Sequence, residues 1–201
     1  MSGENETLPI ESIFTEDDDW HCNACLNWSH DSLELYVVGY KEAADSLVAR
    51  VIETGRHQDA LVFPICFLYR QYIELRLKEI IQSGRCVLDE PGKFPQHHNI
   101  QRLWETATTI MNRIFSEDPE PPSILTLASH VVAEFSNIDP ASFAFRYPSD
   151  KQGANPLEGL AHINLRRVAE YVNAFAEVID AVSSAISVYL DQKNEFRPYE
   201  H

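Results

Sequence analysis

The longest regular pattern in the sequence lies in its C-terminal third, where apolar residues recur every three or four positions from about residue 160 to residue 191. This spacing places them on one face of an α-helix. The members of the stripe are Leu165, Val168, Val172, Phe175, Ile179, Val182, Ile186 and Tyr189. A helix with a single apolar face must bury that face against other elements. The chain is therefore expected to be built from packed helices.

Four shorter stripes with the same spacing precede it, beginning near Leu33, Leu61, Ile100 and Ser123. The second is expected to begin at Asp59 as its N-cap and to stop at Gly84. No pair of alternating segments joined by a hairpin turn competes with these helices. The sequence predicts an all-α fold, an antiparallel bundle of about five helices with an up-and-down course.

Length and composition fit one globular domain with tails, because the chain has 201 residues, 44% of them hydrophobic and 23% charged. We expect an irregular acidic leader over residues 1–30, the bundle over 31–192 and a polar tail over 193–201. The longest uncharged apolar stretch covers residues 60–69, half of the ~20 residues that a spanning helix needs. With no signal-peptide pattern at residue 1, we expect a cytoplasmic protein without a membrane partner.

The formal net charge is −15, and the first 19 residues hold seven acids and no base. Nucleic-acid binders usually present a basic surface, so the overall charge disfavours that class. A local basic cleft remains compatible with an acidic leader. That leader is expected to contact a basic partner or to mask such a cleft.

One possible metal site lies in the leader, where Cys22, Cys25 and His30 could supply three tetrahedral zinc ligands, with His21 or Asp31 as a fourth. A structural zinc site would normally include a second pair of ligands, and Cys66 and Cys86 do not have the required spacing. We therefore expect reduced thiols, and neither a metal nor another cofactor.

The second expected helix carries charges inside an otherwise apolar segment. Arg70, Glu74 and Lys78 follow each other at intervals of four residues. A solvated ladder of ion pairs would account for this spacing. Because the residues before Arg70 are apolar all round, a buried structural ion pair or a ligand site are the alternatives.

Two further groups are candidate functional residues. His97 and His98 stand directly before the third helix, where imidazoles could assist proton transfer beside free backbone N–H groups. Arg146 lies between Phe145 and Tyr147 in a long loop, so its guanidinium could stack on an aromatic ring while it binds a carboxylate or phosphate.

Together these pieces resemble the HEPN superfamily of all-α domains. The resemblance covers about residues 33–191 and rests on the charged second helix, the His98-Asn99-Ile100 segment with Leu103, the Arg146-Tyr147-Pro148 loop and the long last helix. It implies a homodimer. Many members are metal-independent ribonucleases in toxin–antitoxin, CRISPR and phage-defence systems, whereas others are non-catalytic modules for nucleotide binding or assembly.

Active members carry an Arg followed after four to six residues by a His. In this chain Arg146 is followed by no histidine before His162, and the formal match from Arg50 to His57 lies at the end of the first helix. We therefore expect a HEPN-like module of a defence or toxin–antitoxin type of system, non-catalytic or partner-dependent, that dimerises and binds a protein partner, a nucleotide or RNA.

The alternative is a metal-independent endoribonuclease whose site forms across a dimer. Its catalytic residues would be His97, His98 and Arg146. In either case Arg70, Glu74 and Tyr147 are the expected ligand-binding residues.

Overall fold

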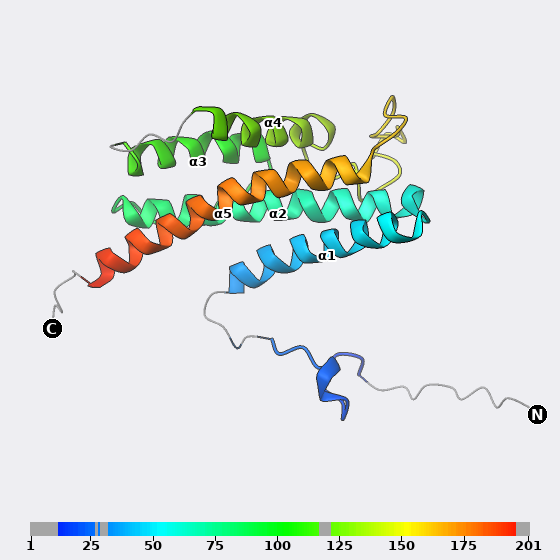
Figure 1. Ribbon diagram of the computed structural model, residues 1–201, viewed down its shortest axis with the longest axis horizontal. Helices are drawn as coiled ribbons and strands as arrows, with labels where there is room; N and C mark the ends of the chain where they lie inside the picture. The colour runs from blue at the N-terminus through cyan, green and yellow to red at the C-terminus, as the bar shows by residue number, and fades with distance from the viewer. Residues whose placement is uncertain (1–11, 27, 29–31, 117–121, 196–201) are drawn as a thin grey trace, which may run out of the picture. The chain divides into compact units, whose positions relative to one another are not determined.

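The structure is a computed structural model that describes residues 12–26, 28, 32–116 and 122–195 (Figure 1). It divides into two units, residues 1–32 and residues 33–201. Over its described residues the first unit contains one short 3₁₀ helix, η1 (Trp20–Cys22), next to which Asn23 and Asp17 are hydrogen-bonded to each other. Cys22 and Cys25 are exposed free thiols, and His30 lies outside the described residues.

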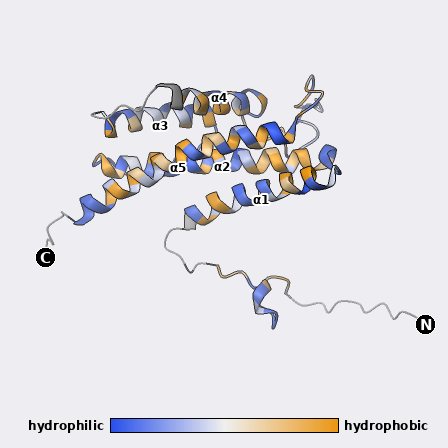
Figure 2. Cartoon of the chain, viewed as in Figure 1, coloured by the Kyte–Doolittle hydropathy of each residue, from blue (hydrophilic) through white to orange (hydrophobic). Residues whose placement is uncertain are grey.

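The second unit is all-helical over the described residues, as the sequence predicts. Its helices are α1 (Ser32–Thr54), α2 (Gln58–Val87), α3 (Ile100–Ile114), α4 (Pro122–Ile138) and α5 (Leu165–Glu195). Figure 2 shows polar and apolar residues alternating along them. The outer helices α1, α3, α4 and α5 each carry exposed residues as well as a face in the core, whereas α2 has no exposed residue from position 64 to position 87.

The helix ends follow from local chemistry. Gly55 ends α1 with a φ of 62°, a conformation that glycine adopts without a steric penalty. The expected N-cap at Asp59 is wrong, because the N-cap of α2 is His57, two residues earlier, in the left-handed conformation. Asn99 caps α3, and its side chain accepts a hydrogen bond from the Arg102 amide at 2.9 Å.

Gly84 does not stop α2, contrary to the sequence prediction. The helix runs on to Val87, and Gly84 is a buried position inside it. A Cβ atom at Gly84 would collide with Cγ2 of Ile110 on α3. The glycine therefore allows two helix backbones to approach closely rather than ending one of them.

The course of the chain is up-and-down at three connections, since α1–α2, α3–α4 and α4–α5 run antiparallel (Figure 1). The connection from α2 to α3 differs. Arg70 contacts the backbone of His98 while Gly84 faces Ile110, so α2 and α3 run parallel. The segment over residues 88–99 thus returns along α2 before α3 begins, and it brings both histidines to the middle of that helix.

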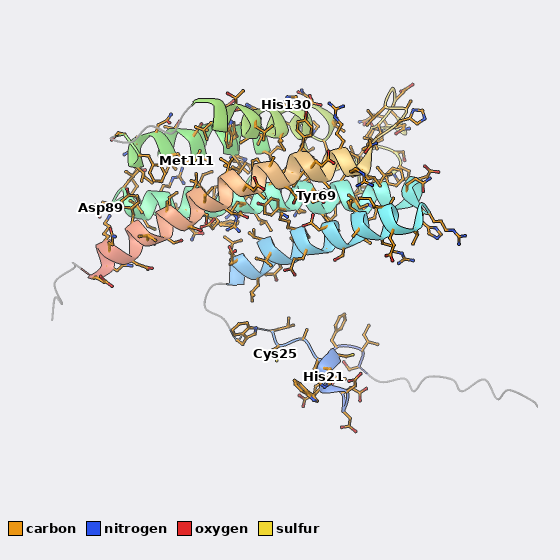
Figure 3. The ribbon with its side chains drawn as sticks, in the orientation of Figure 1. His21, Cys25, Tyr69, Asp89, Met111 and His130 are labelled. Atoms are coloured by element: carbon orange, nitrogen blue, oxygen red, sulfur yellow. The ribbon has the colours of Figure 1, made fainter. Side chains whose placement is uncertain are left out.

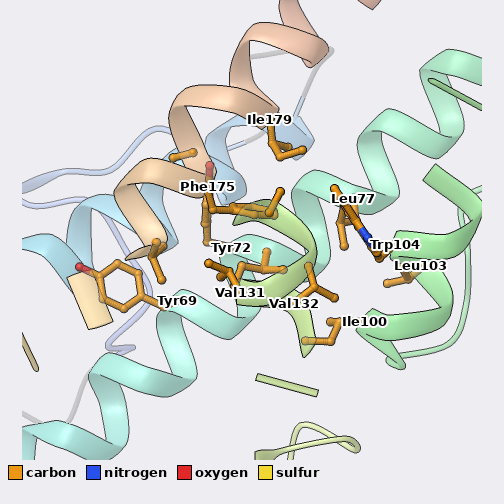
Figure 4. Close-up of a cluster of buried hydrophobic side chains, with 14 of the residues drawn as sticks. Tyr69, Tyr72, Leu77, Ile100, Leu103, Trp104, Val131, Val132, Phe175 and Ile179 are labelled. Atoms are coloured by element: carbon orange, nitrogen blue, oxygen red, sulfur yellow. The ribbon is translucent and has the colours of Figure 1, made fainter. Parts of the chain in front are cut away.

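The core lies where α2, α3, α4 and α5 meet (Figure 4). Tyr72 packs edge-on against Phe175 with ring centroids 6.2 Å apart, and Trp104 lies 6.5 Å from the same ring. Val37, Ala44 and Val48 bring one face of α1 into this core. The packed aromatic rings provide much of the buried apolar area that stabilises the bundle.

Helix α5 continues through Glu195, three residues into the range expected to be a polar tail. Lys193 explains the extension, because its ammonium donates to the carbonyl oxygens of Cys86 and Val87 at the end of α2. Among the described helices, α5 is the one whose length and apolar content would suffice to cross a bilayer, a test that buried core helices also pass. Its apolar stripe packs in the core described above.

Candidate functional site

Arg70 is the centre of a buried charge network. Its side chain is 0% exposed, and each of its three nitrogen atoms donates a hydrogen bond. Nη1 donates to Glu74 at 2.9 Å, Nη2 to the carbonyl oxygen of His98 at 2.7 Å, and Nε to the carbonyl oxygen of Asp139 at 2.9 Å. A buried guanidinium is tolerated only when it is paired in this way.

Glu74 shares its carboxylate among three partners. Besides Arg70, Lys78 Nζ lies 2.9 Å and His98 Nδ1 lies 2.7 Å from Oε1. Burial by itself would raise the pKa of Glu74, but the hydrogen bonds from Lys78, His98 and Arg70 outweigh it, and the pKa is lowered. Of the three interpretations of the Arg70–Glu74–Lys78 spacing, the geometry supports the buried ion pair.

Asp139 connects this network to the loop that follows α4. Its Oδ2 lies 3.6 Å from Arg70 Nε, and its Oδ1 accepts hydrogen bonds from the amides of Phe143 and Ala144. The side chain of Asp139 is nearly fully buried. Through Asp139 the core arginine fixes the backbone that leads to Arg146.

The two adjacent histidines lie in different surroundings. The His98 side chain is 64% exposed and is oriented by the buried carboxylate of Glu74. His97 Nδ1 is buried without a hydrogen-bond partner. Burial and the nearby cations Arg102 and Lys78 lower the pKa of His97, so its neutral form is favoured.

A second charge cluster, centred on Arg76, is not visible in the sequence pattern. Its guanidinium binds Glu34 of α1 through two nitrogens, at 2.7 and 3.0 Å, and Nη1 lies 3.3 Å from Glu79. Nε lies 2.9 Å from Asp180 of α5. Glu34 and Asp180 belong to helices far from Arg76 along the chain, so only the folded structure brings them together.

Arg146 and Tyr147 lie apart from the buried network, on the surface. The Arg146 guanidinium lies 5.8 Å from the ring centroid of Phe67 and 5.5 Å from that of Tyr147, which in turn stacks on Phe143 at 4.8 Å. Among the described residues Arg146 forms no ion pair. The aromatic rings thus hold the guanidinium while its hydrogen-bonding edge stays available.

The same two residues line a groove of about 830 Å³ beside the start of α2. Phe63, Tyr147 and Leu160 contribute half-exposed apolar side chains to it. Residues 140–169, which include most of its wall, carry four Lys and Arg against two Asp and Glu, in contrast to the acidic remainder of the chain. The charged residues of the lining itself are Arg146 and Asp59, so the surplus of positive charge belongs to the segment that surrounds the groove.

The predicted site residues thus separate into two groups. Arg70, Glu74 and His98 come together, whereas Arg146 and Tyr147 line the groove and neither His97 nor His98 does. Phe63, Leu160 and His162 of the groove were missed. The half-buried Phe63 could have been found as an apolar residue outside the stripe of its helix.

Within the part of the chain that the structure describes, no three His, Cys, Asp or Glu side chains are close enough to hold a metal ion. Comparison with protein-family models, with curated proteins and with solved structures finds no match.

Proposed function

We propose that the chain is a HEPN-like helical module that binds an RNA or nucleotide ligand without cleaving it, as a dimer in a bacterial defence or toxin–antitoxin type of system. One observation carries the non-catalytic part of this proposal. The expected catalytic residues do not share one site in the chain, because Arg146 lines the groove while neither His97 nor His98 belongs to its lining and His98 is held by Glu74. A guanidinium that stabilises charge on a phosphate and a histidine that transfers a proton must both reach the same reacting group.

The binding part rests on the groove around Arg146. Aromatic rings suit the stacking of bases, and a guanidinium without an ion pair suits a phosphate. The groove offers Tyr147 and Phe63 for the first interaction and Arg146 for the second. The acidic charge of the rest of the chain would confine an anionic ligand to this region.

The test is binding of a fluorescein-labelled mixed-sequence single-stranded RNA, followed by fluorescence anisotropy in EDTA at several salt concentrations. We expect Arg146→Gln to weaken binding roughly tenfold and to reduce the salt slope by about one. Tyr147→Leu should weaken binding with the salt slope unchanged, because it removes stacking and no charge.

Arg50→Gln is the matched control, since Arg50 is an exposed cation on α1 that does not line the groove. Its binding should equal that of the wild type. Equal losses for Arg50→Gln and Arg146→Gln would contradict the assignment of the groove. Absence of RNA binding by the wild type would contradict the proposed ligand and favour a protein partner.

A second candidate function is favoured by the contact between Glu74 and His98. A buried carboxylate 2.7 Å from Nδ1 of an exposed imidazole orients the ring and leaves Nε2 to act as a general base. A metal-independent ribonuclease would use His98 in this way. Cleavage of end-labelled RNA in EDTA that is lost in His98→Ala and retained in His97→Ala would establish this function instead.

Dimerisation, which the resemblance implies, is supported by the outer face of α1. Leu35 and Tyr36 are large apolar side chains that remain exposed there. Analytical ultracentrifugation of the wild type and of a Leu35→Glu/Tyr36→Glu variant tests this. We expect a dimer for the wild type and a monomer for the variant, and a monomeric wild type would contradict it.

A further inference from the structure

A second hollow, of about 280 Å³, adjoins the groove and shares Phe145, His162 and Ile163 with it. It lies between α4 and the first turns of α5, with Cys66 of α2 also in its wall. Most of its lining is apolar, including Val131, Phe135, Ile138 and Val168. Burial raises the pKa of Cys66 to about 12, so this residue is a neutral thiol that adds to the apolar surface.

The lining holds two charged residues, Arg167 and Glu134. Arg167 belongs to the lining, and its guanidinium lies 5.6 Å from the centroid of the Tyr171 ring. His130, labelled on α4 in Figure 3, lies 5.9 Å from the same ring. Over the described residues Arg167 forms no ion pair, and Glu134 is the single acid of the lining.

We propose that this hollow binds a small amphiphilic carboxylate, such as a medium-chain fatty acid. Its apolar chain would lie against Val131, Phe135 and Val168, and its carboxylate would form a bidentate hydrogen bond with Arg167. Apolar pockets with a few polar groups at the mouth are typical small-molecule sites, and the volume limits the ligand to a small one. A single guanidinium fork matches a carboxylate in both charge and geometry.

This ligand is distinct from the RNA or nucleotide of the proposed function. Binding of this ligand requires neither Arg146, which lines the groove, nor a dimer. Because Phe145, His162 and Ile163 belong to both walls, a ligand in the hollow would contact residues that also shape the groove. Binding here can be measured whether or not RNA binds.

The experiment is a titration of the full ¹⁵N-labelled chain with octanoate, followed by ¹H–¹⁵N NMR, beside parallel titrations with 1-octanol and octylamine. Octanoate should shift the amides of Ile163, Val168 and Tyr171. The alcohol and the amine have the same chain without the negative charge, so they should bind roughly tenfold or more weakly.

Two neighbouring arginines provide a matched pair of variants. Arg167→Met keeps the apolar stem but removes the charge, and it should weaken octanoate binding roughly tenfold. Arg166 is an exposed cation next to it that is not part of the lining, so Arg166→Met should bind like the wild type. Glu134→Gln should strengthen binding, because it removes the one acid near the carboxylate.

Three results would overturn the proposal. Equal affinities for octanoate, octanol and octylamine would mean that the hollow recognises apolar surface only. Equal weakening by Arg166→Met and Arg167→Met would mean that net charge, and not the Arg167 fork, attracts the ligand. Absence of octanoate-dependent shifts at the amides of Ile163, Val168 and Tyr171 would exclude the site.

Discussion

Glu74 Oε1 lies 2.7 Å from Nδ1 of His98, and this contact joins a carboxylate that is 2% exposed to an imidazole that is 64% exposed. It connects the inside of the bundle to its surface at the middle of α2. The same carboxylate neutralises Arg70 and contacts Lys78. Changes at this one position should therefore affect both the stability of the core and the histidine at the surface.

Replacing Arg70 by Met should destabilise the fold by about 3–5 kcal/mol, because it leaves Glu74 and Asp139 as buried carboxylates without their main counterion. Urea unfolding followed by circular dichroism measures the effect. Arg113→Met serves as a control, since its ion pair with Glu90 is exposed and should contribute at most about 1 kcal/mol. If Arg70→Met and Arg113→Met lower the free energy of unfolding by similar amounts, the buried network contributes no more to stability than an exposed ion pair.

The stability of the fold should fall in acid because of Glu74. Its pKa is lowered in the folded state, so its contribution is fully present above the unfolded pKa of about 4.3 and is lost as the pH falls further. Glu74→Gln should be less stable than the wild type at pH 7, and this difference should shrink below about pH 4. Urea unfolding over pH 3–7 checks this, and a difference independent of pH would contradict it.

Gly84 and Gly39 make a matched pair of helix glycines with opposite expectations. Gly84→Ala should destabilise the chain by about 1–3 kcal/mol, because the new methyl group collides with Ile110. A methyl group added at Gly39 would meet no atom within 4 Å, so Gly39→Ala should stabilise α1 by about 0.5–1 kcal/mol. Thermal and urea unfolding give both values.

An Ile110→Ala background provides the check on this mechanism. There the added methyl group at Gly84 has room, so Gly84→Ala should no longer be destabilising. If Gly84→Ala costs the same in both backgrounds, the close approach of α2 and α3 is not the reason for the glycine.

Asp139→Asn should loosen the backbone that leads to Arg146. The substitution removes the charge facing Arg70 and weakens the acceptor for the Phe143 and Ala144 amides, whose hydrogen exchange should become roughly tenfold faster. Asp150→Asn is the control, because Asp150 accepts from the amides of Gln152 and Ala154 on the exposed part of the same loop. Its effect should be confined to residues 152–154.

The apolar stripes predicted the helices well, because the buried residues of a helix recur every three or four positions and this spacing can be recognised within a short segment of sequence. Each amphipathic face depends on residues a few positions apart, and Asn99 caps α3 as its side-chain chemistry indicates. The predicted stop at Gly84 was wrong for a non-local reason. Glycine at this position leaves room for Ile110, which belongs to the next helix.

By itself, then, the sequence predicted an all-α fold and singled out Arg70 and Glu74, since charges inside an apolar segment require partners. It singled out His98 for a separate reason, because an imidazole directly before a helix lies beside free backbone N–H groups. Only the tertiary structure shows which residues are the partners. Residues 88–99 return along α2, and this brings His98 into contact with Glu74. The end of α4 brings Asp139 close to Arg70. Pairings between distant segments depend on how helices pack and connect, and no local pattern encodes them.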